Sequence, residues 1–407
     1  MRHSFSGILV RYEYEDAKYG DKYNKLSNSH LNERSELYEF YREDELHVNL
    51  WETGRDQFSP FLDIGVMVKC RELVKSVVVD VPWLLDARDV SDLGARLNGE
   101  KSVAAIFNEV VHYDGFAEGN FANISFRKDG VDHKPFTLLR LNSNSFKVEP
   151  SFLSDDTRCT RLTVSLPRVT PTDESDKRKS AYIRFRIKKI PTEVYSVQFD
   201  QKDKSLISSI NETRIVDFRI NVLRGVPEEL ISSEVSLAFP KFERIHCFLT
   251  TLRDEECASV TSNYKGYRSL MDEDVWNEYI RLDNSEGISE ATSVRNYLGY
   301  QWTASSSKSG AAKDLIVLGR FSKVRSDYAS IFRFIGFVIL FGAVGSGVWD
   351  LGSGCVFSDK FWRLGCWTKL GIILVYVFLG LAIAFGSLVC SNFMSGLTSW
   401  WQNKKKK

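Results

Sequence analysis

A short run of basic residues is the part of the sequence whose residue types and spacing could do chemistry. Arg184, Arg186 and Lys188 alternate with the apolar residues of Ile183–Ile187, so in a strand the three cations share one face. Lys177–Lys179 precede them. Guanidinium and ammonium groups form charge-assisted hydrogen bonds with phosphate, so this face predicts a site for a phosphate-bearing ligand, a nucleotide second messenger or a nucleic-acid strand. The alternative is an edge strand that carries charge to prevent pairing with other chains.

Motifs for catalysis or metal binding are not found elsewhere in the sequence. It has no glycine-rich dinucleotide or P-loop signature, no H-E-x-x-H, no G-x-S-x-G and no EF-hand loop. His246, Cys247 and Cys257 lack metal-ligand spacing, and His246 lies in an apolar run typical of a strand. We therefore predict no catalytic residue, no cofactor and no metal site, which makes an enzyme the less favoured reading.

The C-terminal region, Tyr328–Lys407, contains two long runs without charge. These are Phe334–Trp349 and Leu370–Asn403. A helix of about 20 apolar residues is long enough to cross the hydrocarbon core of a bilayer. The two runs predict a two-helix transmembrane hairpin, and the alternative is a buried helical hairpin of a large soluble protein.

Small residues recur at four-residue spacing in both runs, which favours close helix packing in lipid and a homo-oligomer. These predicted packing positions are Gly342, Ala343, Gly347, Gly380, Ala384 and Gly386. Between the runs, Cys355 and Cys366 could form a disulfide or remain two free cysteines, and both readings stay open. The upstream cysteines show no paired spacing and indicate free thiols in a reducing compartment.

Basic residues flank the outer ends of the predicted hairpin more densely than its loop, and four of them form the tail Lys404–Lys407. Because basic residues accumulate on the cytoplasmic side, both termini are expected in the cytoplasm of a cell whose inner membrane the protein crosses more than once. Met1–Asp16 has no apolar core of the length that a secretory signal requires. The composition of this N-terminal segment agrees with a cytoplasmic N-terminus.

The 407 residues carry a formal net charge of +1, and the part before residue 328 is mildly acidic, which argues against a general nucleic-acid binder. We expect an α+β fold with a mainly antiparallel, sandwich-like β region and the C-terminal hairpin. The expected divisions are a mixed α/β part at 1–115, a mainly β part at 116–302, a linker and membrane entry at 303–327, and the hairpin at 328–407. Helices are predicted at Asp86–Asn98, Lys101–Val111, Leu270–Leu282 and Ser289–Tyr300, and a flexible linker at Thr303–Ala312.

A large cytoplasmic domain followed by a membrane hairpin over Tyr328–Trp401 resembles the membrane effectors of bacterial abortive-infection antiphage systems, including the two-transmembrane effector of retrons. The resemblance implies a toxin that acts on the lipid bilayer of the inner membrane when triggered. Its soluble domain would sense, or be restrained by, a protein or nucleoprotein partner such as a reverse transcriptase with its DNA. No functional residue carries over, because the resemblance is one of layout.

Two other functions fit the same layout. Lys404 and Lys405 occupy the positions of a K-K-x-x retrieval signal, which would place the protein in the endoplasmic-reticulum membrane. A membrane-tethered enzyme of an unrecognised family is the other alternative.

Overall fold

The computed structural model describes residues 5–15, 44–53, 60–116, 121–152, 158–167, 180–199, 211–232, 237–259, 261–281, 293–306, 310–324 and 328–351, and the single positions 368, 371, 374, 375 and 378. The chain divides into two compact units. The first comprises Met1–Gln198 and Arg214–Phe321, and the second comprises Phe199–Thr213 and Ser322–Lys407. This division differs from the expected one, because the first unit joins segments from both sides of the expected boundary near residue 115.

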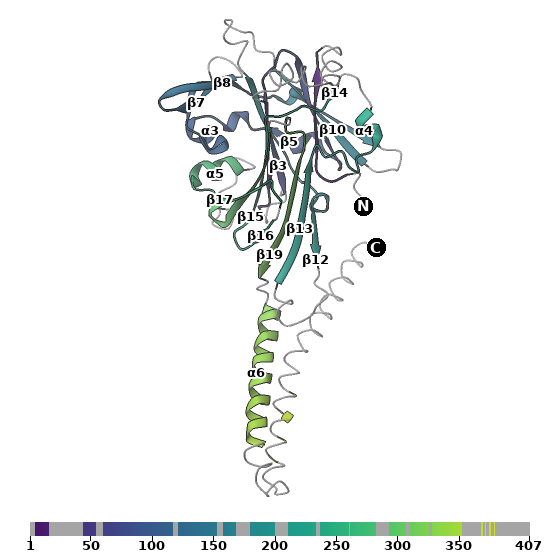
Figure 1. Ribbon diagram of the computed structural model, residues 1–407, viewed down its shortest axis with the longest axis vertical. Helices are drawn as coiled ribbons and strands as arrows, with labels where there is room; N and C mark the ends of the chain where they lie inside the picture. Colours follow the sequence, from purple (N-terminus) through teal and green to yellow (C-terminus); the bar gives the residue numbers. More distant parts are fainter. Residues whose placement is uncertain are drawn as a thin grey trace. The chain divides into compact units, whose positions relative to one another are not determined.

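A ten-stranded mixed sheet runs through the first unit (Figure 1), in the order β17-β18-β15-β2-β3-β11-β8-β7-β6, with β5 paired to β11. Two of its pairings, β2 with β15 and β8 with β11, are parallel. The strands are β2 (Glu45–Trp51), β3 (Phe61–Val68), β5 (Val90–Asp92), β6 (Val111–Phe116), β7 (Phe121–Lys128), β8 (Val131–Leu139), β11 (Ser180–Ile187), β15 (Arg244–Leu252), β17 (Tyr264–Ser269) and β18 (Tyr297–Ser305).

Two smaller sheets complete the β structure of the described residues. A five-stranded antiparallel sheet has the order β14-β1-β4-β10-β9, and a four-stranded sheet has the order β12-β13-β19-β16. Their strands are β1 (Leu9–Tyr14), β4 (Val74–Val81), β9 (Phe146–Phe152), β10 (Arg158–Ser165), β12 (Ser196–Phe199), β13 (Asn211–Ile220), β14 (Leu237–Ala238), β16 (Glu256–Ala258) and β19 (Leu315–Val324).

The main hydrophobic core lies on one face of the ten-stranded sheet and joins it to the five-stranded sheet. Val79 of β4 and Leu162 of β10 share this core with Ile64 of β3 and Ile183 of β11, and all four side chains are at most 1% exposed. Successive residues of a strand point to opposite faces, so every second residue of β3 and β11 enters this core. The β-rich region expected from the alternation of residues is present, but its largest sheet is mixed rather than antiparallel.

The opposite face of the ten-stranded sheet is covered by two helices, α3 (Glu100–Phe107) and α5 (Glu273–Ile280), which pack against each other. They lie together on one side of the sheet (Figure 1). Val103 of α3 and Trp276 of α5 join Phe61 and Tyr182 of the sheet in a second buried cluster. Helices are thereby confirmed within the predicted ranges Lys101–Val111 and Leu270–Leu282, although α3 ends at Phe107 and Val111 begins β6.

The two other predicted helices of this unit are wrong. Asp86–Asn98 folds as 3-10 turns around β5, because β5 pairs with β11, and the side chains of Asp86 and Asp92 accept hydrogen bonds from nearby backbone N–H groups. Of the described residues in Ser289–Tyr300, those from Tyr297 onward belong to β18. Pairing with β15 and β17 overrides the helical spacing seen in the sequence.

The predicted flexible linker Thr303–Ala312 is also wrong over its described residues. β18 continues to Ser305, with Thr303 buried opposite His246, and Ala312 pairs with Phe242. Small, polar residues such as these are typical of flexible linkers, which is why the composition predicts one here. The neighbouring strands supply the backbone partners that order them.

The C-terminal part contains α6 (Tyr328–Leu351), a helix of 24 residues in the second unit. Within the residues described by the structure, no helix is both long enough and apolar enough to span a bilayer. The expected fold class, with its two-helix transmembrane hairpin, is corrected to β sheets with few helices. The lack of charge alone predicts a span here, whereas residues such as Gly342, Gly345 and Ser346 are uncharged without being strongly apolar.

Candidate functional site

The predicted basic patch lies on an inner strand. β11 pairs with β3 on one side and with β8 and β5 on the other. Arg184 and Arg186 are 0% and 1% exposed, and Lys188 is partly buried just beyond the strand. Both arginines are buried because α5 covers this face of the sheet, so the predicted basic face is not open at these two residues. The edge-strand alternative is wrong, because β11 has strand partners on both sides. Lys177–Lys179 lie outside the described residues.

Arg186 is held by a buried carboxylate. Its Nε and Nη2 donate to the two carboxylate oxygens of Asp63 at 2.6 and 2.9 Å, and its guanidinium lies 4.1 Å from the ring centroid of Phe61. The Nη groups also reach the backbone carbonyls of Tyr279 and Ile280 at 3.3 Å. A bidentate arginine and carboxylate pair of this kind is a structural contact, because its donors are directed at protein atoms.

Arg184 is held by hydroxyl groups instead. Its Nε donates to Tyr279 Oη at 2.5 Å and its Nη1 donates to Tyr182 Oη at 2.9 Å. Its Nη2 is buried and has no hydrogen-bond partner among the described residues. Leaving a buried charged donor unpaired is costly, so a further acceptor at Nη2 would stabilise this arrangement.

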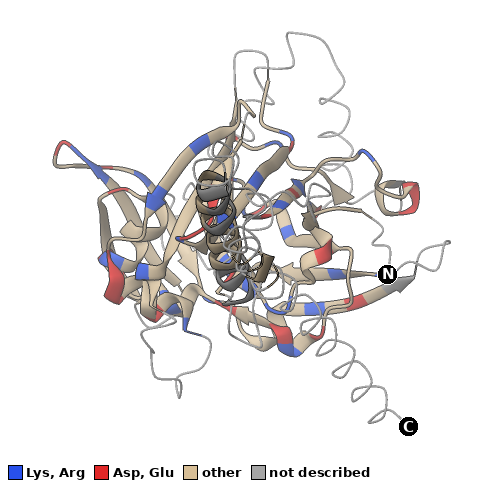
Figure 2. Ribbon diagram, turned by 90° about the horizontal axis from the view of Figure 1, so that it is seen from below, with Lys and Arg blue, Asp and Glu red and all other residues tan. Residues whose placement is uncertain are grey.

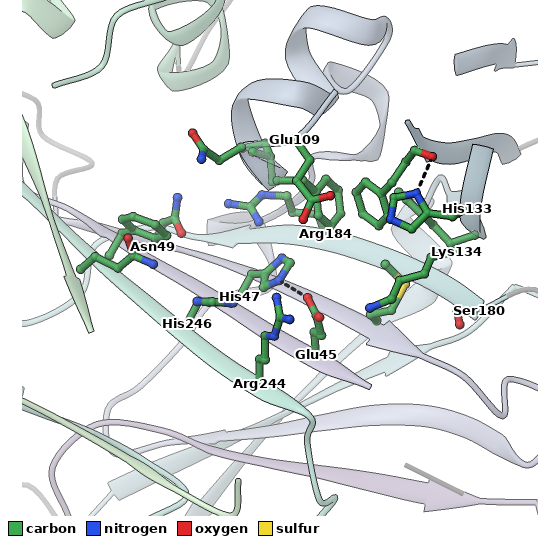
Figure 3. Close-up of a pocket in the computed structure, with 18 of the residues that line it drawn as sticks. Glu45, His47, Asn49, Glu109, His133, Lys134, Ser180, Arg184, Arg244 and His246 are labelled. Carbon is green, nitrogen blue, oxygen red and sulfur yellow. Dashed lines mark hydrogen bonds and ion pairs between the residues drawn. The ribbon is translucent and has the colours of Figure 1, made fainter. Parts of the chain in front are cut away.

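That donor belongs to a residue lining a pocket of about 620 Å³ on the helix-covered face of the large sheet (Figure 3). The floor comes from β2, β11 and β15, and the wall comes from the end of α3 and the β7–β8 hairpin. Cations outnumber carboxylates among the described lining residues. They are Lys128, Lys134, Arg184, Arg244 and Arg268, against Glu45 and Glu109.

The excess of cations in the pocket is a local property. In Figure 2, basic and acidic residues are interspersed along the ribbons rather than gathered on separate faces. Arg184 is fully buried and Arg268 is partly buried, with its guanidinium 4.5 Å from the ring centroid of Phe248, whereas Arg244 is exposed at the rim. Burial lowers the pKa of Arg268. The pocket therefore combines a desolvated inner cation with hydrated outer ones.

The sequence places polar side chains in this pocket through the two-residue period of β2. Leu46 and Val48 enter the main core, so Glu45, His47 and Asn49 point to the other face and line the pocket. Gly65 of β3 is paired with His47, and its lack of a side chain leaves room for the Tyr182 side chain of β11. A Cβ at Gly65 would lie 2.1 Å from Tyr182 Oη.

Two histidines and a glutamate meet at the pocket floor. His47 of β2 is directly paired with His246 of β15, and their ring centroids are 5.4 Å apart. Glu45 lies two residues before His47 on the same face, with its Oε2 3.1 Å from His47 Nε2. One ligand atom from each of the three residues lies within 4.8 Å of the others.

Both imidazole rings are oriented from behind by hydroxyl groups. Tyr182 Oη lies 3.3 Å from His47 Nδ1, and Thr303 Oγ1 lies 3.0 Å from His246 Nδ1. Burial, followed by the charge of His47, lowers the pKa of His246 to about 4. Burial acts to raise the pKa of Glu45, but the hydrogen bond from His47 and the nearby positive charges lower it to about 2. At neutral pH the cluster therefore presents a neutral His246 beside an ionised Glu45.

The remaining predicted sites stay untested. Gly342, Ala343 and Gly347 lie in α6, and Gly342 is exposed, with space for a Cβ at its position. Gly380, Ala384, Gly386, Cys355 and Cys366 lie outside the described residues. Of the upstream cysteines, Cys247 and Cys257 are free thiols.

The sequence analysis singled out Arg184 but missed Glu45, His47 and Asn49, which line the same pocket. The available signal was the set of polar residues at every second position of β2, a strand that is otherwise apolar. No protein-family model matches the sequence, and a comparison with curated proteins finds no match. The site is therefore argued from its geometry.

Proposed function

We propose that the β-rich domain is a receptor for a phosphate-bearing small molecule of about the size of a nucleotide. The observation that carries the proposal is the buried Nη2 of Arg184, which has no partner among the described residues and belongs to a side chain lining the pocket. A planar guanidinium matches phosphate oxygens, and in a site shielded from water its hydrogen bonds to an anion are strong.

The size and lining of the pocket support a ligand with an aromatic part as well as a phosphate. Its volume of about 620 Å³ falls within the range of small-molecule sites. Phe107 and Phe136 form part of the inner wall, while Asn49 and Gln301 offer amide groups. A base can pack beside Phe107, which is partly exposed, and hydrogen-bond to the amides while its phosphate meets Arg184.

The rim explains how such a ligand would be attracted from solution. Lys128, Lys134 and Arg244 are exposed around the opening. Exposed cations increase the rate of association with an anion but hold it weakly, because salt screens them. Selectivity therefore rests with Arg184 at the floor.

Isothermal titration of the purified full-length protein tests this proposal. The probes are inorganic phosphate, AMP, ATP, GTP and cyclic di-GMP, with adenosine as the control that lacks phosphate. Arg184→Lys keeps the charge but loses the fork of donors, so we expect it to weaken binding of the preferred nucleotide by about tenfold or more.

Arg186→Lys is the matched control, because the same change is made two residues away on the same face, where the donors are satisfied by Asp63. We expect its folded fraction to bind the nucleotide as the unmodified protein does. If no phosphate-bearing probe binds, or if both variants weaken binding equally, the proposal is wrong.

A sensing domain of this kind is compatible with the effector function expected from the sequence, in which a soluble domain responds to a partner or signal. The toxin activity, the inner-membrane localisation and the homo-oligomer stay predictions. Depolarisation of the cell membrane on addition of the bound nucleotide would support the toxin activity.

A further inference from the structure

We propose that Glu45, His47 and His246 bind one divalent transition-metal ion of the Zn²⁺ class. Two imidazoles and one carboxylate form a ligand set that suits Zn²⁺ and other first-row ions, and such sites with three protein ligands leave coordination positions open. The sequence expectation was that no metal site exists. The proposal is separate from nucleotide binding and does not require it.

The backbone brings the three ligands together without distortion. His47 and His246 face each other across the parallel pairing of β2 and β15, and Glu45 lies on the same face of β2. Atoms that coordinate one Zn²⁺ at about 2.0 to 2.2 Å lie about 3.3 Å from one another. The separation of 3.1 Å between Glu45 Oε2 and His47 Nε2 meets this requirement. The three ligand atoms all lie within 4.8 Å of one another, so a bound metal ion would draw the more distant ones closer.

The second shell of the cluster is also that of a metal site. A histidine ligand normally has its other ring nitrogen held by a hydrogen-bonding group, which fixes the ring. Tyr182 serves His47 in this way and Thr303 serves His246, in each case through Nδ1. Both rings therefore have Nε2 as the atom that remains to meet a metal.

The neighbouring cations argue against a bare metal ion and determine what accompanies it. Arg184, Arg244 and Arg268 line the same pocket, so a divalent cation beside them is repelled unless anions balance it. Glu45 supplies one negative charge. An anionic group in an open coordination position would supply more, so chloride or phosphate in the buffer is expected to strengthen metal binding.

Spectroscopic titration with Co²⁺ tests the site, because Co²⁺ takes the same ligands as Zn²⁺ and absorbs visible light when bound with low coordination number. The full-length, tag-free protein is first treated with a chelator. We expect about one equivalent of Co²⁺ to bind and to be displaced by Zn²⁺. His246→Ala and Glu45→Gln should each weaken binding by about 100-fold or more, and Thr303→Val by about tenfold.

His133→Ala is the matched control. His133 lines the same pocket, but its Nδ1 lies 3.0 Å from the carbonyl oxygen of Phe126, away from the cluster. Circular dichroism establishes that each variant is folded before titration. Substoichiometric binding by the unmodified protein, or equal loss in His133→Ala and His246→Ala, would overturn the proposal. Since Co²⁺ is titrated without nucleotide, the result is independent of the receptor function.

Discussion

Two arginines on the same face of β11 are held in opposite ways. Arg186 meets a fully buried carboxylate on the neighbouring strand, and its end of the sheet is filled by Phe61, Trp51 and α5. Arg184, two residues earlier, meets two tyrosine hydroxyls and faces a pocket. The first arrangement satisfies a charge within the protein, and the second leaves part of it for a ligand. Arg186 is therefore a structural residue, and Arg184 is the residue proposed to bind the ligand.

The largest effect on stability is expected from Asp63→Ala, which removes the carboxylate that pairs with Arg186. Arg186 would remain buried without a carboxylate, and breaking a buried ion pair in this way costs about 3 to 5 kcal/mol. Urea denaturation of the full-length protein measures the change in the free energy of unfolding. A cost below about 1 kcal/mol, which is typical of an exposed pair, would show that the two arginines are held alike.

A smaller loss of stability is expected from Gly65→Ala, which adds a methyl group beside Tyr182 and Arg184. The new methyl group would overlap Tyr182 Oη and crowd Arg184 Nη1, which lie 2.1 and 2.8 Å from the Cβ position. Overpacking of this kind costs about 1 to 3 kcal/mol. Nucleotide and Co²⁺ binding should both fall, because the displaced groups serve both sites. Gly299→Ala is the control, since its nearest neighbours lie 3.8 Å from the Cβ position.

Tyr182→Phe removes the hydroxyl that lies between Arg184 and His47. We expect a loss of about 1 kcal/mol in the free energy of unfolding, the usual value for one buried hydrogen bond. Co²⁺ affinity should decrease by about tenfold as the His47 ring loses its support. Unchanged binding by this variant would mean that the hydroxyl plays no part in orienting either group.

The smallest effect on stability is expected from Arg184→Met. An apolar side chain of similar length removes a buried charge that has no carboxylate partner among the described residues, so the free energy of unfolding should change by less than about 1 kcal/mol or increase. Arg186→Met is the contrasting variant and should be strongly destabilised, because Asp63 is then left unpaired. Thermal and urea denaturation of the two variants compare them directly.

The sequence predicts which face of β11 enters the core, because Ile183, Phe185 and Ile187 alternate with the charged residues. All three are buried as expected. It does not predict which elements cover the opposite face of β11. That depends on α3 and α5, whose helical periodicity was visible but whose position on the sheet was not. Burial of Arg184 and Arg186 follows from this packing and has no local signal.

The metal-ligand cluster could not be predicted for a different reason. Glu45 and His47 share a strand face by simple alternation, but nothing near them specifies that β15 lies alongside β2 and brings His246 opposite His47. The same limitation explains the misread linker. The small, polar neighbours of Thr303 predict a linker, whereas Thr303 is a strand residue that orients His246.

The parallel pairing of β2 with β15 also sets when the site can exist during synthesis. The two strands are about 200 residues apart in the chain, and ribosomes add about 5 to 20 residues per second, so β2 waits about 10 to 40 s for its partner. Throughout that interval the edge of β2 that later pairs with β15 is open to other chains. Pairing with β3 covers only the opposite edge of β2, so a nascent chain has no assembled site until β15 has been made.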